Sequence, residues 1–373
     1  MNVIVLKNNL KEALSIISGA RKESGNLPIL KNFLLETQGE KLKLSSTDLE
    51  IGINALISAK IIKEGSLVIP YNIFNQIINN LTSERISLEK KDNSLLITSD
   101  NYKAKISTVS KEDFPIIPEI KNKKANFCEC ESDYFIESLS SVVSACQVSD
   151  IRPELSGINF WFKNNEIKLA ATDSFRLAEK TMSDKKIDFQ FEKEFSFIIP
   201  LKTASEIIRI FSLKKDEKIK IFFELNQISV ESENIKLFSR LIEGKFPEYE
   251  FIIPKDFETE AVMDKNDLVG ALKLSGSLSN RLNEVKFITD ESFKNIRVFS
   301  SSQEFGESEY LLPAKIKGTV AKVIFNWRFI LDGLKNLKNQ SVFIGFNGEE
   351  KASLIKSADD PSYVYIVMPI KSS

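Results

Sequence analysis

The chain has 373 residues, 42% of them hydrophobic, and a formal net charge of −1, which together allow two or three globular domains with packed cores. It contains no histidine, so the commonest general base and metal ligand is absent and catalysis is disfavoured. No apolar run approaches the roughly 20 residues of a membrane span, and the N-terminus lacks the pattern of a signal peptide. We therefore expect a cytoplasmic protein with no membrane contact.

Cysteine and glycine usage argues against cofactor chemistry. The three cysteines are Cys128, Cys130 and Cys146, and the Cys-Glu-Cys spacing puts two thiols on one face of a strand rather than in a metal site. We expect all three to be reduced and free. The 14 glycines form no phosphate-binding loop motif, so nucleotide hydrolysis is not expected. We predict no metal and no cofactor.

The first third of the chain reads as a mixture of strands and two amphipathic helices. Apolar residues at helical spacing predict helices over residues 10–18 and 71–81, the second following a strand that ends at Pro70. The predicted strands cover residues 2–6, 33–37, 41–47, 49–57, 86–90, 94–98 and 103–107. The unit closes with the sequence DFPIIP at residues 113–118.

The second third repeats that order. Ser132 is a candidate N-cap for a helix, and a second helix follows Pro200 as the earlier one follows Pro70. The predicted strands cover residues 157–162, 166–171, 176–182, 219–224, 227–231 and 236–241. The sequence KFPEYEFIIP at residues 245–254 corresponds to DFPIIP.

The last third carries the same pattern with less sequence likeness. Asp264 or Asn266 is a candidate cap for its first helix, and FNWRFILDGLKNL stands at the position of its second. The predicted strands cover residues 284–288, 295–300, 307–312, 341–346, 351–356 and 364–368. The chain is therefore predicted to be α+β, with three copies over residues 1–124, 125–254 and 255–373, each holding two helices and about eight strands. Such copies are either independent duplicated domains or parts of a curved or closed array that presents its helices on one side.

Two Thr-Asp pairs, Thr47-Asp48 and Thr172-Asp173, occupy equivalent places in the first two copies. The carboxylates are candidates for a metal site or an acid–base pair. Each lies in its own copy, however, and aspartate after a strand commonly accepts hydrogen bonds from turn amides, which favours a structural role. Arg176 either orients the same turn or faces a partner's peptide.

Basic residues gather on the predicted helices although the total charge is neutral. Such residues are usually only a solvated face, but symmetry would place them on one surface, where they would hold a phosphate backbone without reading sequence. They are Lys11, Arg21, Lys22, Lys202, Arg209, Lys273, Lys335 and Lys338.

The ordered segments AATDSFRLA, IIPLKTASEIIRIF, LIEGKFPEYEFIIP, FNWRFILDGLKNLK and VYIVMPIK resemble the bacterial DNA polymerase III beta subunit, the sliding clamp. LPILKNFLLE and STDLEIGI extend the resemblance to the first copy. The resemblance implies three clamp domains, a head-to-tail homodimer that closes a ring around duplex DNA, no catalytic activity, and processivity for the replicative polymerase. It also implies partners: the polymerase alpha subunit, a clamp loader, and other DNA polymerases and repair proteins that bind through short peptide motifs.

The resemblance also implies site residues. The partner-peptide cleft is expected from Leu155, Thr172, Ser174, Phe175, Arg176, Leu177, Pro247, Ile252, Asn326, Phe329, Val367, Met368 and Pro369. Ser174, Phe175 and Phe251 stand where relatives often carry glycine, histidine and a basic residue, so we expect a more apolar cleft. The DNA-facing set is Lys11, Arg21, Lys22, Lys202 and Arg209, and the dimer interface is expected at Ala104, Ile106, Ser277 and Leu278.

Two hypotheses from other classes remain at this stage. An enzyme that uses Asp48 and Asp173 would lose turnover on mutation of either residue to asparagine. A peptide-binding scaffold without DNA encirclement would keep its cleft but would not be retained on circular DNA.

Overall fold

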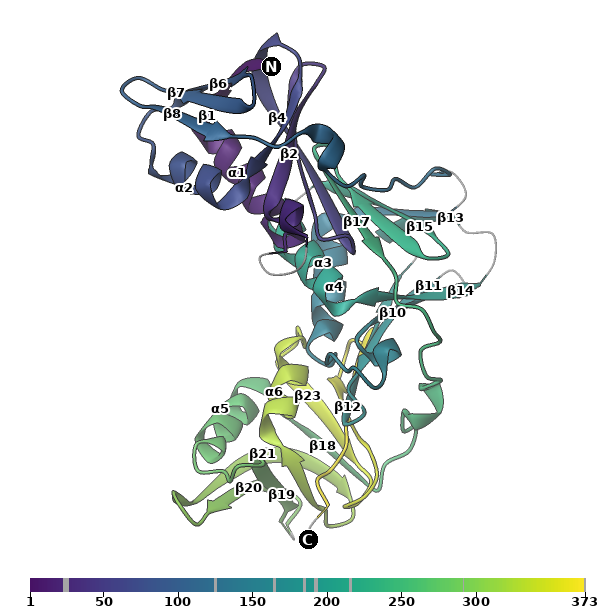
Figure 1. Ribbon diagram of the computed structural model, residues 1–373. Coiled ribbons are helices and arrows are strands. Elements are labelled where there is room, and N and C mark those ends of the chain that lie inside the picture. Colours follow the sequence, from purple (N-terminus) through teal and green to yellow (C-terminus); the bar gives the residue numbers. More distant parts are fainter. Residues whose placement is uncertain are drawn as a thin grey trace. The chain divides into compact units, whose positions relative to one another are not determined.

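The computed structural model describes residues 1–22, 27–123, 126–163, 166–183, 186–190, 194–214, 217–290 and 292–371. The predicted boundary between residues 124 and 125 lies outside this range. Within it, no helix is long and apolar enough to cross a membrane. Figure 1 colours the chain from its N-terminus to its C-terminus and labels many of the helices and strands.

The first third has two α-helices, α1 and α2, packed against one another. They are α1 (Lys7–Ile17) and α2 (Tyr71–Asn80). Its strands are β1 (Asn2–Leu6), β2 (Asn32–Gln38), β3 (Lys41–Thr47), β4 (Ile51–Lys63), β5 (Ser66–Pro70), β6 (Arg85–Lys91), β7 (Ser94–Thr98) and β8 (Lys103–Ser107). Short 3-10 turns are η1 (Ser18–Ala20), η2 (Pro28–Lys31) and η3 (Lys111–Asp113).

The second third has helices α3 (Ser132–Val143) and α4 (Leu201–Phe211). Its strands are β9 (Phe127–Glu131), β10 (Gly157–Lys163), β11 (Glu166–Thr172), β12 (Arg176–Met182), β13 (Ile187–Gln190), β14 (Phe195–Pro200), β15 (Lys218–Glu224), β16 (Gln227–Glu231) and β17 (Ile235–Arg240). Two 3-10 turns are η4 (Pro153–Leu155) and η6 (Glu250–Ile252).

The last third has helices α5 (Lys265–Gly276) and α6 (Trp327–Lys335), which also contact one another. Its strands are β18 (Thr259–Asp264), β19 (Glu284–Thr289), β20 (Asn295–Ser302), β21 (Gly306–Gly318), β22 (Lys322–Asn326), β23 (Ser341–Phe346), β24 (Ser353–Ser357) and β25 (Tyr363–Val367). Two helices per copy agree with the prediction.

The strands form two antiparallel sheets, and each sheet spans more than one copy. One sheet runs β13-β9-β15-β16-β17-β4-β1-β6-β7-β8, with β2, β3 and β5 alongside, and the other runs β14-β10-β11-β12-β25-β24-β23-β18-β21-β20-β19-β22. The first sheet is joined between copies by β17 and β4, with Leu237 opposite Ile53. The second is joined by β12 and β25, with Leu177 opposite Ile366. The copies therefore share continuous sheets and are not independent domains.

The chain also divides into two compact units, each built on one sheet. The first comprises residues 1–133, 188–192 and 209–241, and the second comprises residues 134–187, 193–208 and 242–373. The central copy thus contributes strands to both units.

The structure tests predictions for the α5 cap, the start of β4 and the cysteines. The helix α5 begins after Asp264, whose carboxylate accepts hydrogen bonds from the amides of Asn266 and Asp267, so Asp264 rather than Asn266 is the cap. The predicted strand start at Leu49 was wrong, because Leu49 has a φ of 78° and lies in the turn before β4. The three cysteines are free, as expected, and all three are also buried.

Candidate functional site

The two Thr-Asp pairs form the same turn in the two units. In the first, the Asp48 carboxylate accepts from the amides of Glu50 and Ile51 at 3.0 and 2.7 Å. In the second, Asp173 accepts from the amides of Phe175 and Arg176, both at 3.0 Å. The residues Leu49 and Ser174 both have a left-handed φ, of 78° and 76°.

The threonine completes each turn. The Thr47 hydroxyl donates to the Ile51 carbonyl at 2.8 Å, and the Thr172 hydroxyl donates to the Arg176 carbonyl at 2.7 Å. Both carboxylates therefore serve backbone amides, which confirms the structural role predicted for them. Among the described residues, no group of three or more histidine, cysteine, aspartate or glutamate side chains could hold a metal ion.

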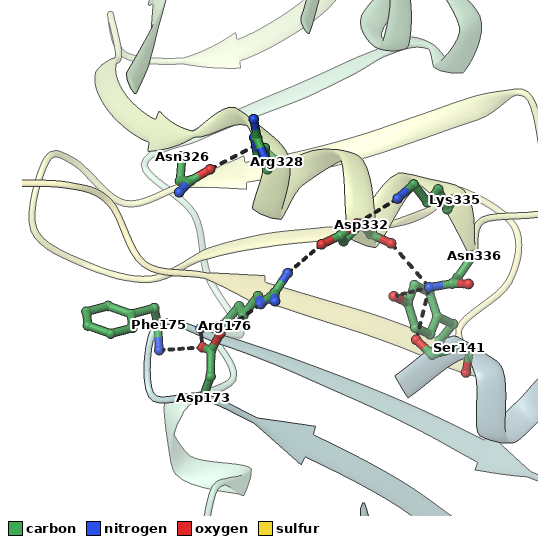
Figure 2. A network of polar contacts seen from close by, with 10 residues as sticks. Ser141, Asp173, Phe175, Arg176, Asn326, Arg328, Asp332, Lys335 and Asn336 are labelled. Atoms are coloured by element: carbon green, nitrogen blue, oxygen red, sulfur yellow. Dashed lines mark hydrogen bonds and ion pairs between the residues drawn. The ribbon is translucent and has the colours of Figure 1, made fainter. Parts of the chain in front are cut away.

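The side chain of Arg176 connects this turn to helix α6 in the second unit (Figure 2). Its Nε donates to Asp173 Oδ2 at 2.9 Å, and its Nη1 donates to Asp332 Oδ2 at 2.7 Å. The guanidinium also lies 4.3 Å from the centre of the Phe329 ring. Both alternatives for Arg176 therefore stay open, since it orients the turn and also borders the predicted cleft.

The environment of Arg176 keeps it charged. Burial lowers the pKa of the guanidinium, but neighbouring Tyr365, Asp332 and Asp173 raise it by more, so the net shift is upward. The network continues along α6, where Lys335 donates to Asp332 at 2.8 Å. The Nδ2 atom of Asn336 then donates to the Ser141 carbonyl at the C-terminal part of α3, at 3.0 Å (Figure 2).

Strand pairing brings most of the predicted cleft residues together. Arg176 is opposite Val367 in the β12–β25 ladder, and the amide of Met368 donates to the Phe175 carbonyl at 2.8 Å. Phe175 is 62% exposed and Met368 is 37% exposed, so both offer apolar surface. Pro369 follows them and is half-buried.

Other predicted cleft residues are buried or half-buried. Leu155 and Leu177 are 5% and 1% exposed and belong to one apolar cluster with Phe246 and Tyr249. Asn326 caps α6 by accepting from the amide of Arg328 at 3.0 Å (Figure 2). The residues Thr172 and Val367 are also buried. Leu155, Leu177, Thr172 and Val367 thus lie beneath the surface, whereas Phe175, Met368 and Ile252 are exposed.

A cavity of about 290 Å³ lies beside the Thr-Asp turn of the second unit. Leu155 and Ser174, two of the predicted cleft residues, line it together with Val148, Ile151 and Arg152 from the loop after α3. Val148 and Ile151 are 67% and 92% exposed. Sequence reasoning missed these two, although two apolar side chains within the polar sequence QVSDIRPE are a readable signal.

Two of the predicted DNA-facing residues are engaged within the first unit. The guanidinium of Arg209 donates to the carbonyls of Ser15 and Ile16 at 2.8 Å each, where it completes the C-terminal end of α1. Arg21 donates to Asn72 Oδ1 at 3.0 Å and stacks 3.7 Å from the Tyr71 ring centre. The side chains of Lys11, Lys22 and Lys202 are exposed.

The predicted interface residues differ in accessibility. Strand β8 pairs only with β7 among the described strands and is a sheet edge, but Ile106 is 7% exposed and faces its own core. Ala104 is half-buried, and Lys103 and Lys105 are exposed. Ser277 ends α5 and is exposed, while Leu278 is half-buried and its neighbour Leu274 is 59% exposed.

Comparison with known proteins identifies the family of the chain. The chain matches the DNA polymerase III beta subunit N-terminal domain over residues 1–118, the central domain over 129–248 and the C-terminal domain over 250–371. The chain belongs to the DNA polymerase III beta subunit family. It is 28% identical to the beta sliding clamp of Staphylococcus epidermidis, over 98% of this chain and 97% of that protein.

Solved structures of the family have the same fold over the whole chain. The DNA polymerase III beta subunit of Thermotoga maritima is 26% identical with a TM-score of 0.90, and both chains are covered completely. The Bacillus subtilis sliding clamp is 24% identical with a TM-score of 0.94, again over all of both chains. The protein is thus a sliding clamp of three clamp domains, a processivity factor and not an enzyme.

Proposed function

We propose that two copies of this sliding clamp close head to tail into a ring around duplex DNA in the cytoplasm. The ring would tether the replicative polymerase through its alpha subunit, and a clamp loader would open and close it. The ordered match to all three domains of the family carries this proposal. The alternative of a scaffold without DNA encirclement has no observation in its favour.

The DNA contact is proposed to be electrostatic and independent of sequence. Lys11, Lys22 and Lys202 are exposed on or beside helices, which suits contact with phosphates. Arg21 and Arg209 would add positive charge while their hydrogen bonds hold α1 and α2 in place. Because the net charge is −1, simple charge attraction would hold DNA weakly, and topology would supply retention.

Retention on circular DNA tests the encirclement. After loading onto nicked circles, the clamp should remain bound in salt that screens phosphate contacts, and it should slide off once the circle is cut. Equal loss from circular and linear DNA on raising the salt concentration would contradict encirclement.

The partner-peptide cleft is proposed to lie around the β12–β25 pairing. Phe175, Met368 and Ile252 would contact the peptide directly, and Arg176 would bind its polar groups next to Phe329. Leu155 and Leu177 would form the floor, with Thr172, Ser174, Pro247, Asn326, Val367 and Pro369 completing the set. Other polymerases and repair proteins would compete for the same cleft through short motifs.

Peptide titration tests the cleft. Replacing an anchor-pocket residue commonly costs on the order of 2 kcal/mol or more, so we expect Met368→Ala to weaken binding by that amount. Leu225→Ala is the matched control, because it also removes an exposed apolar side chain but lies in the other unit. Unchanged affinity for Met368→Ala, with the dimer intact, would mean that the cleft lies elsewhere.

The ring seam is proposed to join β8 of one copy to the third clamp domain of its partner. Residues 306–313 of β21 pair only with β20 among the described strands, so one edge is available for main-chain pairing. Glu307 and Glu309 are exposed there, opposite in charge to Lys103 and Lys105 of β8. Ala104 and Leu278 would contribute the apolar contact and Ser277 a small polar side chain, whereas the buried Ile106 would support β8 from beneath.

We also propose domain boundaries at residues 1–124, 125–254 and 255–373. The three family matches fall inside these ranges except for a few residues at the start of the last domain.

A further inference from the structure

A second cavity, of about 480 Å³, lies in the second unit outside the proposed cleft. It is lined by Asn159, Trp161 and Ser196 of the sheet and by the segment 245–251. Its size falls within the range of about 300–1,000 Å³ found for small-ligand sites. Only Pro247 belongs to the cleft set.

The floor of this cavity follows from strand register. Along β10, Ile158, Phe160 and Phe162 are buried in the core, so the intervening Asn159 and Trp161 point to the opposite face. Trp161 lies opposite Ser196 of β14 and Lys168 of β11. The segment 245–251 covers this face, since Phe246 and Tyr249 pack in the apolar cluster with Ala170 and Ile198, which flank Asn159.

The wall formed by segment 245–251 is held firmly. The Tyr249 hydroxyl donates to Glu179 Oε2 at 2.7 Å, and the Phe246 and Tyr249 rings meet edge to face at 5.9 Å. Lys168 pairs with Glu250 at 3.2 Å and lies 5.9 Å from the Trp161 ring centre. These contacts fix aromatic surfaces around the opening before any ligand arrives.

One polar group in the floor has no hydrogen-bond partner in the part of the chain that the structure describes. Asn159 is 5% exposed, and its Oδ1 accepts no hydrogen bond from any residue that the structure describes. Leaving a buried acceptor unsatisfied is unfavourable, so such a group favours a ligand that brings a donor. A donor on an otherwise apolar, planar ligand matches the aromatic walls.

We propose that this cavity binds the indole or phenol ring of a tryptophan or tyrosine side chain, carried by a partner polypeptide whose neighbouring residues occupy the peptide cleft. The ring would lie among Trp161, Phe246 and Phe251 and donate its N–H or O–H to Asn159 Oδ1. Phe251 is 80% exposed, so it is available to cover the inserted ring.

Continuity with the cleft identifies the occupant as part of the same partner. Pro247 lines the cavity and is also in the cleft set, and Phe251 of the cavity directly precedes Ile252 of the cleft. An extended segment that crosses residues 251–252 would therefore reach both. This inference rests on the proposed peptide-binding function, and the cavity would give flanking residues of a motif a role in choosing the partner.

A matched pair of fragments tests the cavity by itself. With the intact protein, 3-methylindole should bind at least about tenfold tighter than 1,3-dimethylindole, which has no N–H donor; tenfold corresponds to 1.4 kcal/mol. Asn159→Leu should remove this difference. Ser196→Trp, at an exposed position, should fill the cavity and abolish binding of both fragments. Equal affinities in the wild type, or a difference that survives Asn159→Leu, would overturn the proposal.

Selection from a random 12-residue peptide library tests the partner. Wild-type protein should enrich a cleft-binding segment and, at a fixed distance from it, tryptophan or tyrosine rather than phenylalanine. Ser196→Trp should lose only the aromatic enrichment, whereas Met368→Ala should lose the cleft segment. A cleft segment without aromatic enrichment would overturn this inference and leave the proposed function standing. Failure to select any cleft segment would overturn the proposed function, while the fragments would still decide whether the cavity binds a ring.

Discussion

A glycine at the end of α5 determines how closely this helix approaches α6. A Cβ atom added at Gly276 would lie 2.5 and 2.6 Å from two ring atoms of Trp327, distances that real Cβ atoms essentially never show. The same helix contains Gly270, where an added Cβ would meet nothing within 4 Å. Alanine at these two positions therefore separates the effect of packing from that of helix propensity.

The expected changes have opposite signs. Gly270→Ala should stabilise the protein by about 0.4–1 kcal/mol, because alanine restricts the unfolded chain and favours the helix. Gly276→Ala should destabilise it by about 1–3 kcal/mol, the usual cost of overpacking a filled interface. Because about 1 kcal/mol shifts the melting temperature of a domain of this size by roughly 2–4 °C, calorimetry should resolve the two variants.

The displacement of α6 by Gly276→Ala should also change the geometry of the proposed peptide cleft. Trp327 lies between Asn326 and Phe329 at the start of α6, and its Nε1 donates to Ser279 at 3.2 Å. Gly276→Ala should therefore weaken peptide binding, whereas Gly270→Ala should leave it unchanged. Equal melting temperatures for the two variants would refute the reasoning, since the two helices would then separate at no cost.

Further measurements test other parts of the structure. A double-mutant cycle of Arg176→Ala and Asp332→Ala should give a coupling of about 1–2 kcal/mol in stability, because the pair is largely buried; additive effects would contradict it. Burial raises the pKa of Cys146 to about 12. The neutral thiol therefore contributes its full stability below pH 9, and this contribution is lost as the pH rises toward 12. In urea titrations over that range, the wild type should lose more stability than Cys146→Ala. Analytical ultracentrifugation from nanomolar to micromolar concentration should show a dimer that dissociates more readily than that of relatives, since Ala104 and Ser277 are small and each missing buried methylene forfeits about 0.8 kcal/mol. A dimer that persists throughout the nanomolar range would mean that the charges of β8 and β21 compensate.

Structural features that depend on interactions between residues close in sequence were predictable. In each Thr-Asp turn, the side chains form hydrogen bonds with amides and carbonyls within four residues. The sequence likeness between the copies was therefore enough to predict that the two turns are alike. Helix positions were also predictable, because apolar periodicity marks the buried face. Helix α1 nevertheless begins at Lys7, before its first buried residue Leu10, since periodicity does not mark a polar first turn that has no side-chain cap.

Features that depend on distant residues were not predictable. Arg209 reads as a basic residue on an inner helix, yet its hydrogen bonds go to carbonyls 193 and 194 positions away. Ile106 reads as an interface residue, yet tertiary packing buries it within its own chain. Asn159 reads as an ordinary strand residue, yet segment 245–251 covers this part of β10, and Asn159 Oδ1 is buried with no hydrogen-bond partner among the described residues. In each case the sequence supplies the residue type but not the neighbour that determines its role.

The sharing of sheets between copies means that covalent continuity and structural integrity are separate properties of this protein. Lys121 is exposed on the connection between the first two copies, and a tryptic cut there would leave β4 and β17 joined by their backbone hydrogen bonds. The two fragments would still elute together in gel filtration and would separate only under denaturing conditions. A fragment that ended before residue 126, by contrast, would expose the β4 edge that β17 normally pairs, and it would be prone to aggregate.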